Sequence, residues 1–481
     1  MMHLSTVLLL ALSTRAAVIP SRRSLNQRQA SPKLVVAHHI VGNTFTYTPQ
    51  DWTDDMNLAS ASGIDGFALN IGPDDFQVTQ TQNAFQAADA LGGNFKLFFS
   101  LDMSVLPCAT ADDGAALRQR VLDFATRPSH LQVNGKAFVS TFAGESCTFG
   151  EASVPDGWRN QFTQHPDLQG KIQFVPSFFI DPATFTDFSG VMDGAFNFNS
   201  GWPIQVTVDF ADGIANDLAG TGDSLTNTLN QFIGANATDL QQIGDLANLA
   251  AGGSRLTYMA AVAPHFFTHF GADSFNKNFI FLADQHLLVQ RWETLIALRD
   301  QVDIVEIVTW NDYGESHYVG PIKGVLPPGS EPWVNGFPHQ DWLDLTRYFA
   351  TAFKTGTTPT IDKDQIIMWA RPHPALASSP DPLSPPTTFQ ITQDNIWAVV
   401  MATAAGTATL TDGISPPQTF DVVPGVNKLA IPIAPGGTLS GTLERNGQTV
   451  VSLQTPGSDF TFNGAPALFN YNVFVASATS A

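Results

Sequence analysis

The stretch at residues 305–316 reads Val-Glu-Ile-Val-Thr-Trp-Asn-Asp-Tyr-Gly-Glu-Ser. Its first half is apolar and β-branched, which is typical of a buried strand. Its second half changes abruptly to polar and aromatic residues with a glycine. This change indicates the point where a strand leaves a hydrophobic core, and the rest of the chain is interpreted around it.

Two carboxylates follow this strand, Asp312 and Glu315. In a helical turn their Cβ atoms would be about 5–6 Å apart, and a more open loop would separate them further. Carboxyl pairs of glycosidases are about 5–5.5 Å apart for retention and about 6.5–9.5 Å apart for inversion. The alternative is a pair of turn formers or solvated charges. The flat side chains of Trp310, Tyr313 and His317 favour the glycosidase interpretation, because such rings stack on sugars and raise a carboxyl pKa by excluding water.

Seven further stretches have the apolar pattern of buried strands. They lie at residues 34–40, 64–70, 95–102, 136–142, 171–176, 191–196 and 256–262, and an eighth strand is expected near 304–309. Helices are expected at 51–61, 79–91 and 114–125. This alternation predicts an α/β fold in which eight units close into a (β/α)8 TIM barrel. An open doubly wound sheet is the rival, but no glycine-rich dinucleotide motif follows the first strand.

In a TIM barrel the loops at the carboxyl ends of the strands carry the chemistry. Polar and aromatic residues at predicted strand ends are therefore expected to share one face with Asp312 and Glu315. They are His38, His39, Asn70, Asp102, Glu145, Asn197, Trp202 and His269. Each alone has an ordinary explanation, such as a hydrogen-bonded strand end or a turn cap. Their joint placement predicts a substrate cleft, to which Trp310, Asn311, Tyr313 and His317 also contribute.

The chain of 481 residues is acidic, because 23 Lys and Arg residues face 43 Asp and Glu residues for a net charge of −20. Nucleic acids and anionic membranes are poor partners for such a chain. A neutral substrate fits better. Beyond the N-terminus every apolar run is short or interrupted, so no membrane-spanning helix is expected. A monomer is expected, although the sequence leaves the oligomeric state undetermined.

The N-terminus has the pattern of an export signal. Residues 1–17 contain an apolar run followed by small residues, which is typical of a secretory signal peptide. Residues 18–31 are then a propeptide or a flexible N-terminus, with Arg22 and Arg23 as a dibasic processing site. The sequence therefore predicts a secreted protein that acts outside the cell or at its wall.

The composition changes near residue 371. Six prolines lie between residues 372 and 386, and they predict a linker at 371–388 after a catalytic barrel at 32–370. Short alternating strands follow, at 396–401, 407–411, 419–423, 428–433, 438–445 and 449–454. They predict a β-sandwich at 389–481. This accessory domain either binds carbohydrate or supports the barrel, and the lack of an obvious aromatic row favours support.

The sequence contains 2 cysteines, Cys108 and Cys147. In an exported chain an isolated pair is more often a disulfide than a metal or redox site. Two buried free thiols are the alternative. The sequon at residues 236–238 makes Asn236 a candidate for glycosylation.

Other chemistries find little support. His265 and His269 have the i, i+4 spacing of zinc helices, but the Glu of H-E-x-x-H is missing and Pro264 precedes them. Residues 144–147, Gly-Glu-Ser-Cys, do not form the G-x-S-x-G elbow of an esterase. No phosphate-binding glycine loop is present. No metal and no other cofactor is expected.

Several blocks in this order also resemble one family, the secreted fungal α-1,3-glucanases, or mutanases, of glycoside hydrolase family 71. The blocks are residues 37–42, 63–70, 98–104, 140–145, 266–269 and, most specific, Thr-Trp-Asn-Asp-Tyr-Gly-Glu-Ser-His-Tyr at 309–318. The resemblance implies a (β/α)8 domain with a β-sandwich, endo-hydrolysis of α-1,3-glucan with inversion, and Asp312 and Glu315 as catalytic carboxylates. His265 departs from the pattern, because a bulky aromatic such as Trp is expected there, and this affects one subsite contact.

We therefore expect Glu315 to be the general acid and Asp312 the base that activates water, without a metal. The order of these roles rests on analogy and is open to reversal. The carboxylates, histidines and amide at the other strand ends are expected to bind hydroxyls or tune the pair, and Trp202, Trp310 and Tyr313 to form apolar walls for sugar faces. Two rivals remain, a hydrolase of another α-linked polysaccharide and a secreted wall protein that binds glycan without turnover.

Overall fold

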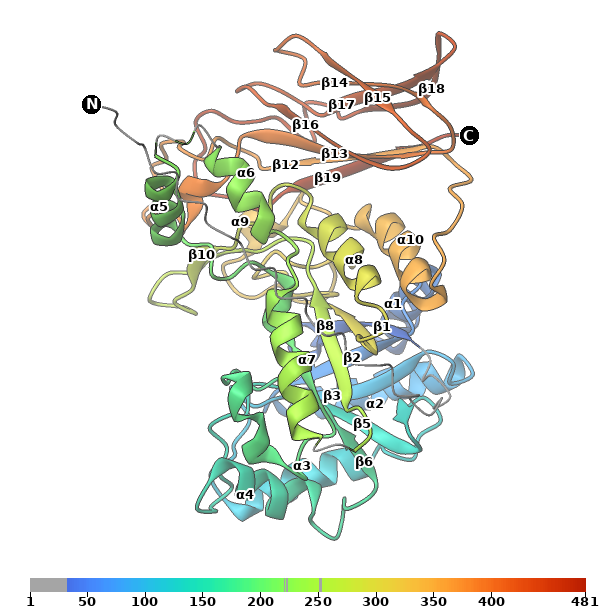
Figure 1. The fold of residues 1–481 in the computed structure, drawn as a ribbon, viewed down its shortest axis with the longest axis vertical. Helices are drawn as coiled ribbons and strands as arrows, with labels where there is room; N and C mark the ends of the chain where they lie inside the picture. Colours follow the sequence, from blue (N-terminus) through green and yellow to red (C-terminus); the bar gives the residue numbers. More distant parts are fainter. Residues whose placement is uncertain (1–32, 220, 222–223, 251–252) are drawn as a thin grey trace, which may run out of the picture. The chain divides into compact units, whose positions relative to one another are not determined.

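All eight strands predicted for the barrel lie in one sheet in a computed structural model of the protein, which describes residues 33–219, 221, 224–250 and 253–481 (Figure 1). The signal peptide and propeptide predicted at residues 1–17 and 18–31 lie outside the described residues. The eight strands are β1 (Leu34–Ile40), β2 (Gly66–Ile71), β3 (Lys96–Asp102), β5 (Lys136–Phe142), β6 (Ile172–Phe174), β7 (Gly194–Asn197), β8 (Thr257–Val262) and β11 (Ile304–Ile307). A short strand, β4 (Gln132–Val133), forms a hairpin with β5.

Helices separate most of these strands. They are α1 (Pro49–Ala61), α2 (Asp75–Ala90), α3 (Ala111–Leu122), α4 (Val154–Trp158), α5 (Val208–Asp217), α6 (Leu225–Leu229), α7 (Ala237–Leu249), α8 (Leu287–Ala297), α9 (Glu331–Val334) and α10 (Trp342–Thr355). A hairpin of β9 (Phe267–His269) and β10 (Asn278–Ile280) follows β8. The chain thus alternates between strand and helix as the sequence predicts, and the mixed α/β architecture fits a TIM-like core.

The sheet is parallel apart from the β4 hairpin, and its order is β6-β5-β3-β2-β1-β11-β8-β7. The two outermost strands, β6 and β7, are also connected by backbone hydrogen bonds. Asp193 N donates to Phe174 O over 2.8 Å, and Phe196 N donates to Pro176 O over 2.9 Å. An open doubly wound sheet has no such connection between its edges.

Alternate residues along the strands pack into two separate hydrophobic clusters. The inner cluster includes Val36, Ala68, Phe98, Phe138, Phe196, Met259 and Ile304. The outer cluster combines strand residues with helix residues such as Trp52, Phe85, Leu117, Trp292 and Phe349. Since side chains alternate between the two faces of a strand, a residue's position in this alternation decides whether it faces the helices or the inner side.

Side-chain caps set the first residues of two helices. Thr48 accepts a hydrogen bond from Asp51 N while Asp51 accepts one from Thr48 N, so α1 begins at Pro49. Thr110 and Asp113 form the same capping box at α3, which stabilises a helix start by about 1 kcal/mol. The predicted start at Gly114 is three residues late for α3, because hydrophobic periodicity does not detect the capped first turn. The predicted start at Thr79 is four residues late for α2, whose N-cap residue Asp74 makes no side-chain cap hydrogen bond.

Two antiparallel sheets of four strands make up the C-terminal part, with orders β16-β13-β12-β19 and β15-β14-β17-β18. The strands are β12 (Gln365–Ala370), β13 (Asn395–Ala402), β14 (Gly406–Thr411), β15 (Gln418–Val422), β16 (Gly425–Pro432), β17 (Ser440–Arg445), β18 (Gln448–Gln454) and β19 (Phe474–Thr479). The six predicted strands are confirmed, while β12 and β19 were missed. Because β12 pairs between β13 and β19, this part begins at Gln365, inside the range predicted for the barrel, 32–370.

The proline-rich segment at 371–388 is packed against its surroundings. The buried Arg371 guanidinium lies 2.7 Å from Asp284, which precedes α8, and it also donates to Tyr471 O. Asp284 accepts a second hydrogen bond from Gln393 N. Three buried histidines, His265, His286 and His339, donate from Nε2 to Tyr471 O, Ala398 O and Val473 O. The C-terminal sheets are therefore joined to the first part of the chain through buried polar contacts, and the expected linker is not a free tether.

The buried contact between Arg371 and Asp284 predicts how removal of the Arg371 charge changes stability. Arg371→Met should lower the free energy of unfolding by about 3–5 kcal/mol, because Asp284 keeps a buried charge without its partner. Urea denaturation measures this loss. The matched control is Lys428→Met, which removes the partly exposed ion pair of Lys428 with Glu293 between the same two parts and should cost less than about 1 kcal/mol. Equal losses in the two variants would contradict the role given to Arg371.

Candidate active site

The loop that leaves β11 is fixed to β1 by side-chain and backbone hydrogen bonds. Asn311 Oδ1 accepts from Ile40 N over 2.7 Å, and Asn311 Nδ2 donates to Ile40 O over 3.0 Å. Trp310 N donates to His38 O, and Asp312 N donates to the Thr309 hydroxyl. Asp312 and Glu315 therefore project from a turn whose backbone is held at the carboxyl ends of two neighbouring strands.

The two carboxylates meet at one imidazole. His317 Nε2 lies 3.3 Å from Asp312 Oδ2 and 3.2 Å from Glu315 Oε2, while its Nδ1 is 3.1 Å from Val308 O. Lys277, which immediately precedes β10, reaches Glu315 Oε1 with its Nζ at 2.6 Å. His317 is buried, whereas about a fifth of each carboxylate side chain is exposed. The acids thus face solvent above a buried cation.

This arrangement shifts the pKa values of three groups. Burial opposes the charge of Glu315, but hydrogen bonds and charges of His317 and Lys277 outweigh it and lower its pKa to about 2. Burial also opposes the charge of His317, but Asp312 and Glu315 raise its pKa to about 9. Partial desolvation lowers the pKa of Lys277, but the charges of Glu315 first, and then of Asp312 and Asp102, outweigh it and raise this pKa above its ordinary value. At neutral pH Glu315 is ionised and His317 is protonated.

The same three side chains could in principle hold a cation. One oxygen or nitrogen of Asp312, Glu315 and His317 lies within 4.8 Å of the others. Lys277 Nζ, however, already places a positive charge 2.6 Å from Glu315. A protonated His317 also cannot act as a metal ligand. The donor set therefore favours neutralisation by side-chain cations over a metal.

Several other predicted residues lie on the same side of the sheet. His38, Asn70 and Asp102 follow inner-cluster residues by two or four positions, so their side chains share the inner side. Glu145 lies in the loop after β5, where it accepts a hydrogen bond from Phe179 N. The Trp202 ring contacts the His317 ring at 5.2 Å, but it is buried and its Nε1 donates to His265 O.

Four predicted contacts have other surroundings. His39 is buried against Trp52 and Phe67 on the helix side, 3.5 Å from Asp55. Asn197 donates to the buried Tyr258 hydroxyl. These outward positions follow from strand alternation, which the prediction did not apply to the strand ends. Asn311 forms the backbone contacts described above. His269 bonds to Asn278 and Asp381, so it does not pair with His265 as in a zinc helix.

The expected aromatic walls also need correction. Trp310 and Tyr313 are fully buried, with Trp310 packed on Phe67 and the Tyr313 hydroxyl bonded to Pro321 O. Neither ring face is open to a sugar. The large exposed rings of this region are instead phenylalanines in loops after strands β1, β6 and β9, namely Phe45, Phe179 and Phe275, which are 62 %, 38 % and 54 % exposed.

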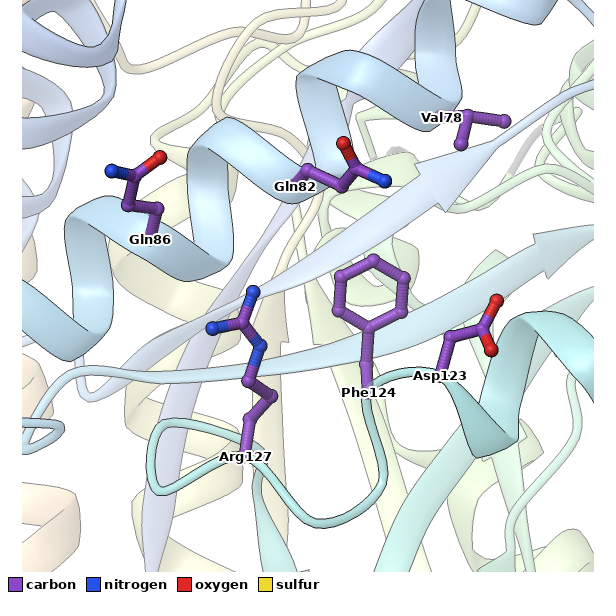
Figure 2. A pocket seen from close by; sticks show the side chains of 6 residues that line it. All are labelled: Val78, Gln82, Gln86, Asp123, Phe124 and Arg127. Carbon is purple, nitrogen blue, oxygen red and sulfur yellow. The ribbon is translucent and has the colours of Figure 1, made fainter.

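Two hollows of the surface differ from the carboxylate site. A groove of about 500 Å³ lies between α2 and the end of α3. Figure 2 shows Gln82 and Gln86 on one side of it, facing Phe124 and Arg127 on the other. A second cavity of about 460 Å³ is lined by His269, Trp333 and residues 463 and 466–470 among others. Neither is lined by Asp312 or Glu315. Each lining contains one carboxylate, Asp123 in the groove and Asp381 in the cavity.

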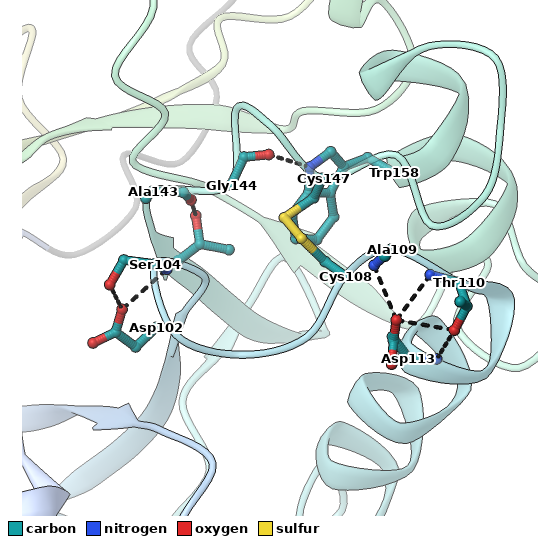
Figure 3. Close-up of a disulfide and its surroundings, with 11 residues drawn as sticks. Asp102, Ser104, Cys108, Ala109, Thr110, Asp113, Ala143, Gly144, Cys147 and Trp158 are labelled. Atoms are coloured by element: carbon teal, nitrogen blue, oxygen red, sulfur yellow. Dashed lines mark hydrogen bonds between the residues drawn. A yellow bond between two sulfur atoms is a disulfide. The ribbon is translucent and has the colours of Figure 1, made fainter.

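The predicted disulfide is confirmed between Cys108 and Cys147, whose Cα atoms are 5.1 Å apart. Figure 3 shows that it ties the loop after Asp102 to the turn that follows Gly144. Phe149 N donates to Cys108 O, and Trp158 Nε1 donates to Gly144 O. The bond therefore fixes the loop that follows Asp102 and the loop that carries Glu145.

Two further predictions concern the surface. Asn236, the glycosylation candidate, is partly exposed at the N-terminal cap of α7. Within the part of the chain that the structure covers, no helix has the length and apolar character needed to cross a membrane.

A close carboxylate pair on the loop after a strand of a TIM-like sheet is the arrangement of a glycoside hydrolase. The family model described as "Glycosyl hydrolase family 71" matches residues 31–481. The chain is also similar to two proteins of Schizosaccharomyces pombe. The glucan endo-1,3-alpha-glucosidase agn1 is 37% identical over 92% of this chain and 94% of its own length. The ascus wall endo-1,3-alpha-glucanase is 30% identical over 92% and 96%.

A third relative is a mutanase of Penicillium rubens, which is 32% identical over 96% of this chain and 92% of its own length. With the family model matching nearly the whole chain, this protein belongs to glycosyl hydrolase family 71. It is therefore a glycoside hydrolase.

Loss of the disulfide should destabilise the fold. Replacing both cysteines, Cys108→Ser with Cys147→Ser, releases a cross-link between residues 39 positions apart and should cost about 4 kcal/mol in the free energy of unfolding. Thermal melting with and without a reductant measures the loss. Reduced wild type should melt with the double variant, and the variant should not respond to reductant. A variant that melts with the oxidised wild type would contradict the expectation.

The raised pKa of His317 predicts a pH dependence of stability. The folded state holds this proton more tightly, with a pKa near 9 against an ordinary 6.5. The resulting stabilisation is complete below pH 6.5 and is lost as the pH rises through about 9. His317→Asn removes it, so the difference in unfolding free energy between wild type and variant should shrink over that range. Urea titrations at several pH values test this, and a constant difference would refute it.

Proposed function

We propose that the protein is an endo-acting hydrolase of α-1,3-glucan. The observation that carries this proposal is the pair Asp312 and Glu315 bridged by His317 and flanked by Lys277. Three relatives aligned over more than nine-tenths of the chain are named as enzymes for α-1,3-linked glucan or as a mutanase. The net charge of −20 also suits a neutral polysaccharide.

In this proposal Glu315 protonates the leaving glycosidic oxygen and Asp312 activates water. Glu315 is ionised in the ligand-free arrangement, so it must gain a proton before it acts as an acid. A sugar inserted beside Lys277, whose side chain is 51 % exposed, would separate that cation from Glu315 and exclude water. Both changes raise the pKa of Glu315. His317, 3.2 Å away, is the adjacent proton donor.

Inversion at the anomeric carbon belongs to the same proposal and rests on the family resemblance. An inverting pair holds a water between carboxyl groups about 6.5–9.5 Å apart, whereas oxygens of Asp312 and Glu315 lie within 4.8 Å in the ligand-free protein. Inversion by these two residues therefore requires the pair to open when substrate displaces its contacts with His317 and Lys277.

We propose a closed (β/α)8 barrel and a C-terminal β-sandwich as the scaffold. The hydrogen bonds between residues of the β6 and β7 segments support closure. A shared hydrophobic cluster supports the sandwich, since it contains Ile366 and Val400 from one sheet and Leu410 and Leu443 from the other. We propose that the boundary between barrel and sandwich lies before Gln365, because β12 pairs with β13 and β19. Buttressing of the barrel is the favoured role for the sandwich, because buried contacts join the two.

The proposed setting is extracellular, with fungal wall α-1,3-glucan as the partner and a monomer as the active form. The relative named for the ascus wall supports action at a wall. The alternative function is that of a wall protein that binds glycan without turnover. Such a protein would bind the polysaccharide but would not require an acid and a base. A hydrolase of another α-linked polysaccharide would keep both carboxylates.

Sugar release distinguishes these functions. Wild type should release reducing sugar from insoluble α-1,3-glucan and not from α-1,4-glucan or β-1,3-glucan. Asp312→Asn and Glu315→Gln should each lower the rate on the order of a thousandfold, while Asp187→Asn, which changes an exposed acid, should have no effect. NMR of the first product should show the anomer opposite to that of the substrate.

Each outcome selects one function. Wild-type protein that pulls down with a glucan but releases no sugar would support the wall-binding rival. Release from the α-1,4 polymer would redirect the substrate assignment. A first product that retains the α configuration would replace inversion with retention.

A further inference from the structure

Glu306 is a buried carboxylate that the mechanism above does not use. It lies on β11 with no exposed surface, between the inner-cluster residues Ile304 and Val308. Its neighbours in the sheet register are Val36 on β1 and Ala261 on β8. Because an apolar side chain would suit this position, the charge calls for an explanation.

One partner compensates this charge. Glu306 Oε1 lies 2.6 Å from His38 Nδ1, and the other oxygen, Oε2, has no hydrogen-bond partner within the described part of the chain. Burial raises the pKa of Glu306, while the contact with His38 lowers it in part. A buried acid with a single polar partner is costly to keep, which indicates a role that acts through that partner.

His38 lies closer to the active face than Glu306. Val36 is the register neighbour of Glu306, and His38 follows it by two residues toward the carboxyl end of β1. Its carbonyl accepts a hydrogen bond from Trp310 N, directly before the loop with both catalytic candidates. Its ring packs edge-on against Phe198 at 5.4 Å, and Phe198 contacts Trp202, which contacts His317. The imidazole therefore lies in the aromatic layer around the carboxylate site.

The second ring nitrogen of His38 is available. Nε2 has no hydrogen-bond partner among the described residues, whereas Nδ1 is engaged by Glu306. A carboxylate on one imidazole nitrogen fixes the orientation of the ring and determines which nitrogen faces a ligand. His265 and His339, by contrast, each direct Nε2 at a backbone carbonyl.

We propose that Glu306 is a positioning residue that holds His38 with Nε2 directed at a glucose hydroxyl of the bound chain. This inference rests on the proposed function and adds a substrate contact to the same site. Glu306 engages Nδ1 over 2.6 Å and fixes the ring, so that Nε2 is the nitrogen left for a ligand. A sugar hydroxyl can both donate and accept a hydrogen bond, and it therefore matches this nitrogen. His38 would then bind the sugar next to Asp312 and Glu315 rather than take part in proton transfer.

Two substitutions separate charge from orientation. Glu306→Gln keeps an oxygen for Nδ1–H but removes the charge, and it should lower kcat/KM on α-1,3-glucan about tenfold. Glu306→Leu removes both and should lower it about a hundredfold. The control is Ile304→Val, a small change on the same strand that should leave kcat/KM within about twofold. Circular dichroism establishes that each variant is folded, and Glu306→Gln carries the test if Glu306→Leu does not fold.

A double-mutant cycle shows whether Glu306 acts through His38. His38→Ala should lose as much as Glu306→Leu, and the double variant should lose no more than either, because both remove one contact. The inference would be overturned if the fold losses in kcat/KM of the two single variants multiplied in the double variant. It would also be overturned if folded Glu306 variants kept the wild-type kcat/KM. Wild-type protein that is inactive on all glucans would instead overturn the proposed function. Glucan binding measured in the Asp312→Asn background should then still weaken with Glu306→Leu, and unchanged binding would overturn the inference too.

Discussion

Two hydrogen bonds of a single amide place the whole carboxylate site. The Asn311 side chain accepts a hydrogen bond from Ile40 N and donates one to Ile40 O, as the backbone of a paired strand does. The hydrogen bonding between β1 and the chain after β11 therefore continues past the last residue of β11. The turn with Asp312 and Glu315 is thereby fixed to the sheet before it enters solvent. The His317 ring then completes the turn, with Nδ1 bonded to Val308 O and Nε2 3.3 Å from Asp312 Oδ2 and 3.2 Å from Glu315 Oε2. Position and charge of the site therefore derive from buried polar groups.

Much of the fold follows from local patterns in the sequence. The eight barrel strands are short apolar runs between polar segments, and each is found within three residues of its predicted bounds. The missed strands show the limit of such patterns. Residues 365–370 adjoin the prolines that suggested a domain boundary, and only pairing with β13 and β19 reveals the sheet to which they belong. Pairing between residues a hundred positions apart leaves little trace in a local window.

The site was predictable to the extent that it lies in one motif. Asp312, Glu315 and His317 lie within six residues of one another. Lys277 lies next to a hairpin strand, 38 positions before Glu315, and no periodicity in the sequence predicts its contact with the site. Glu306 did carry a signal, a charge within a β-branched strand, which implies a buried partner. The prediction of aromatic walls is wrong, because the rings of Trp310 and Tyr313 are buried in the core. The exposed rings belong to Phe45, Phe179 and Phe275, which no motif in the sequence distinguishes from other phenylalanines.

The joint between the two parts of the chain has an evolutionary consequence. Accessory domains on flexible tethers can be exchanged between enzymes, because their neighbours do not depend on them. Here a buried Asp284 and three buried imidazoles of the first part rely on Arg371 and on carbonyl groups of the C-terminal part. A foreign domain would leave these groups without partners. The two parts are thus constrained to evolve as one inseparable body.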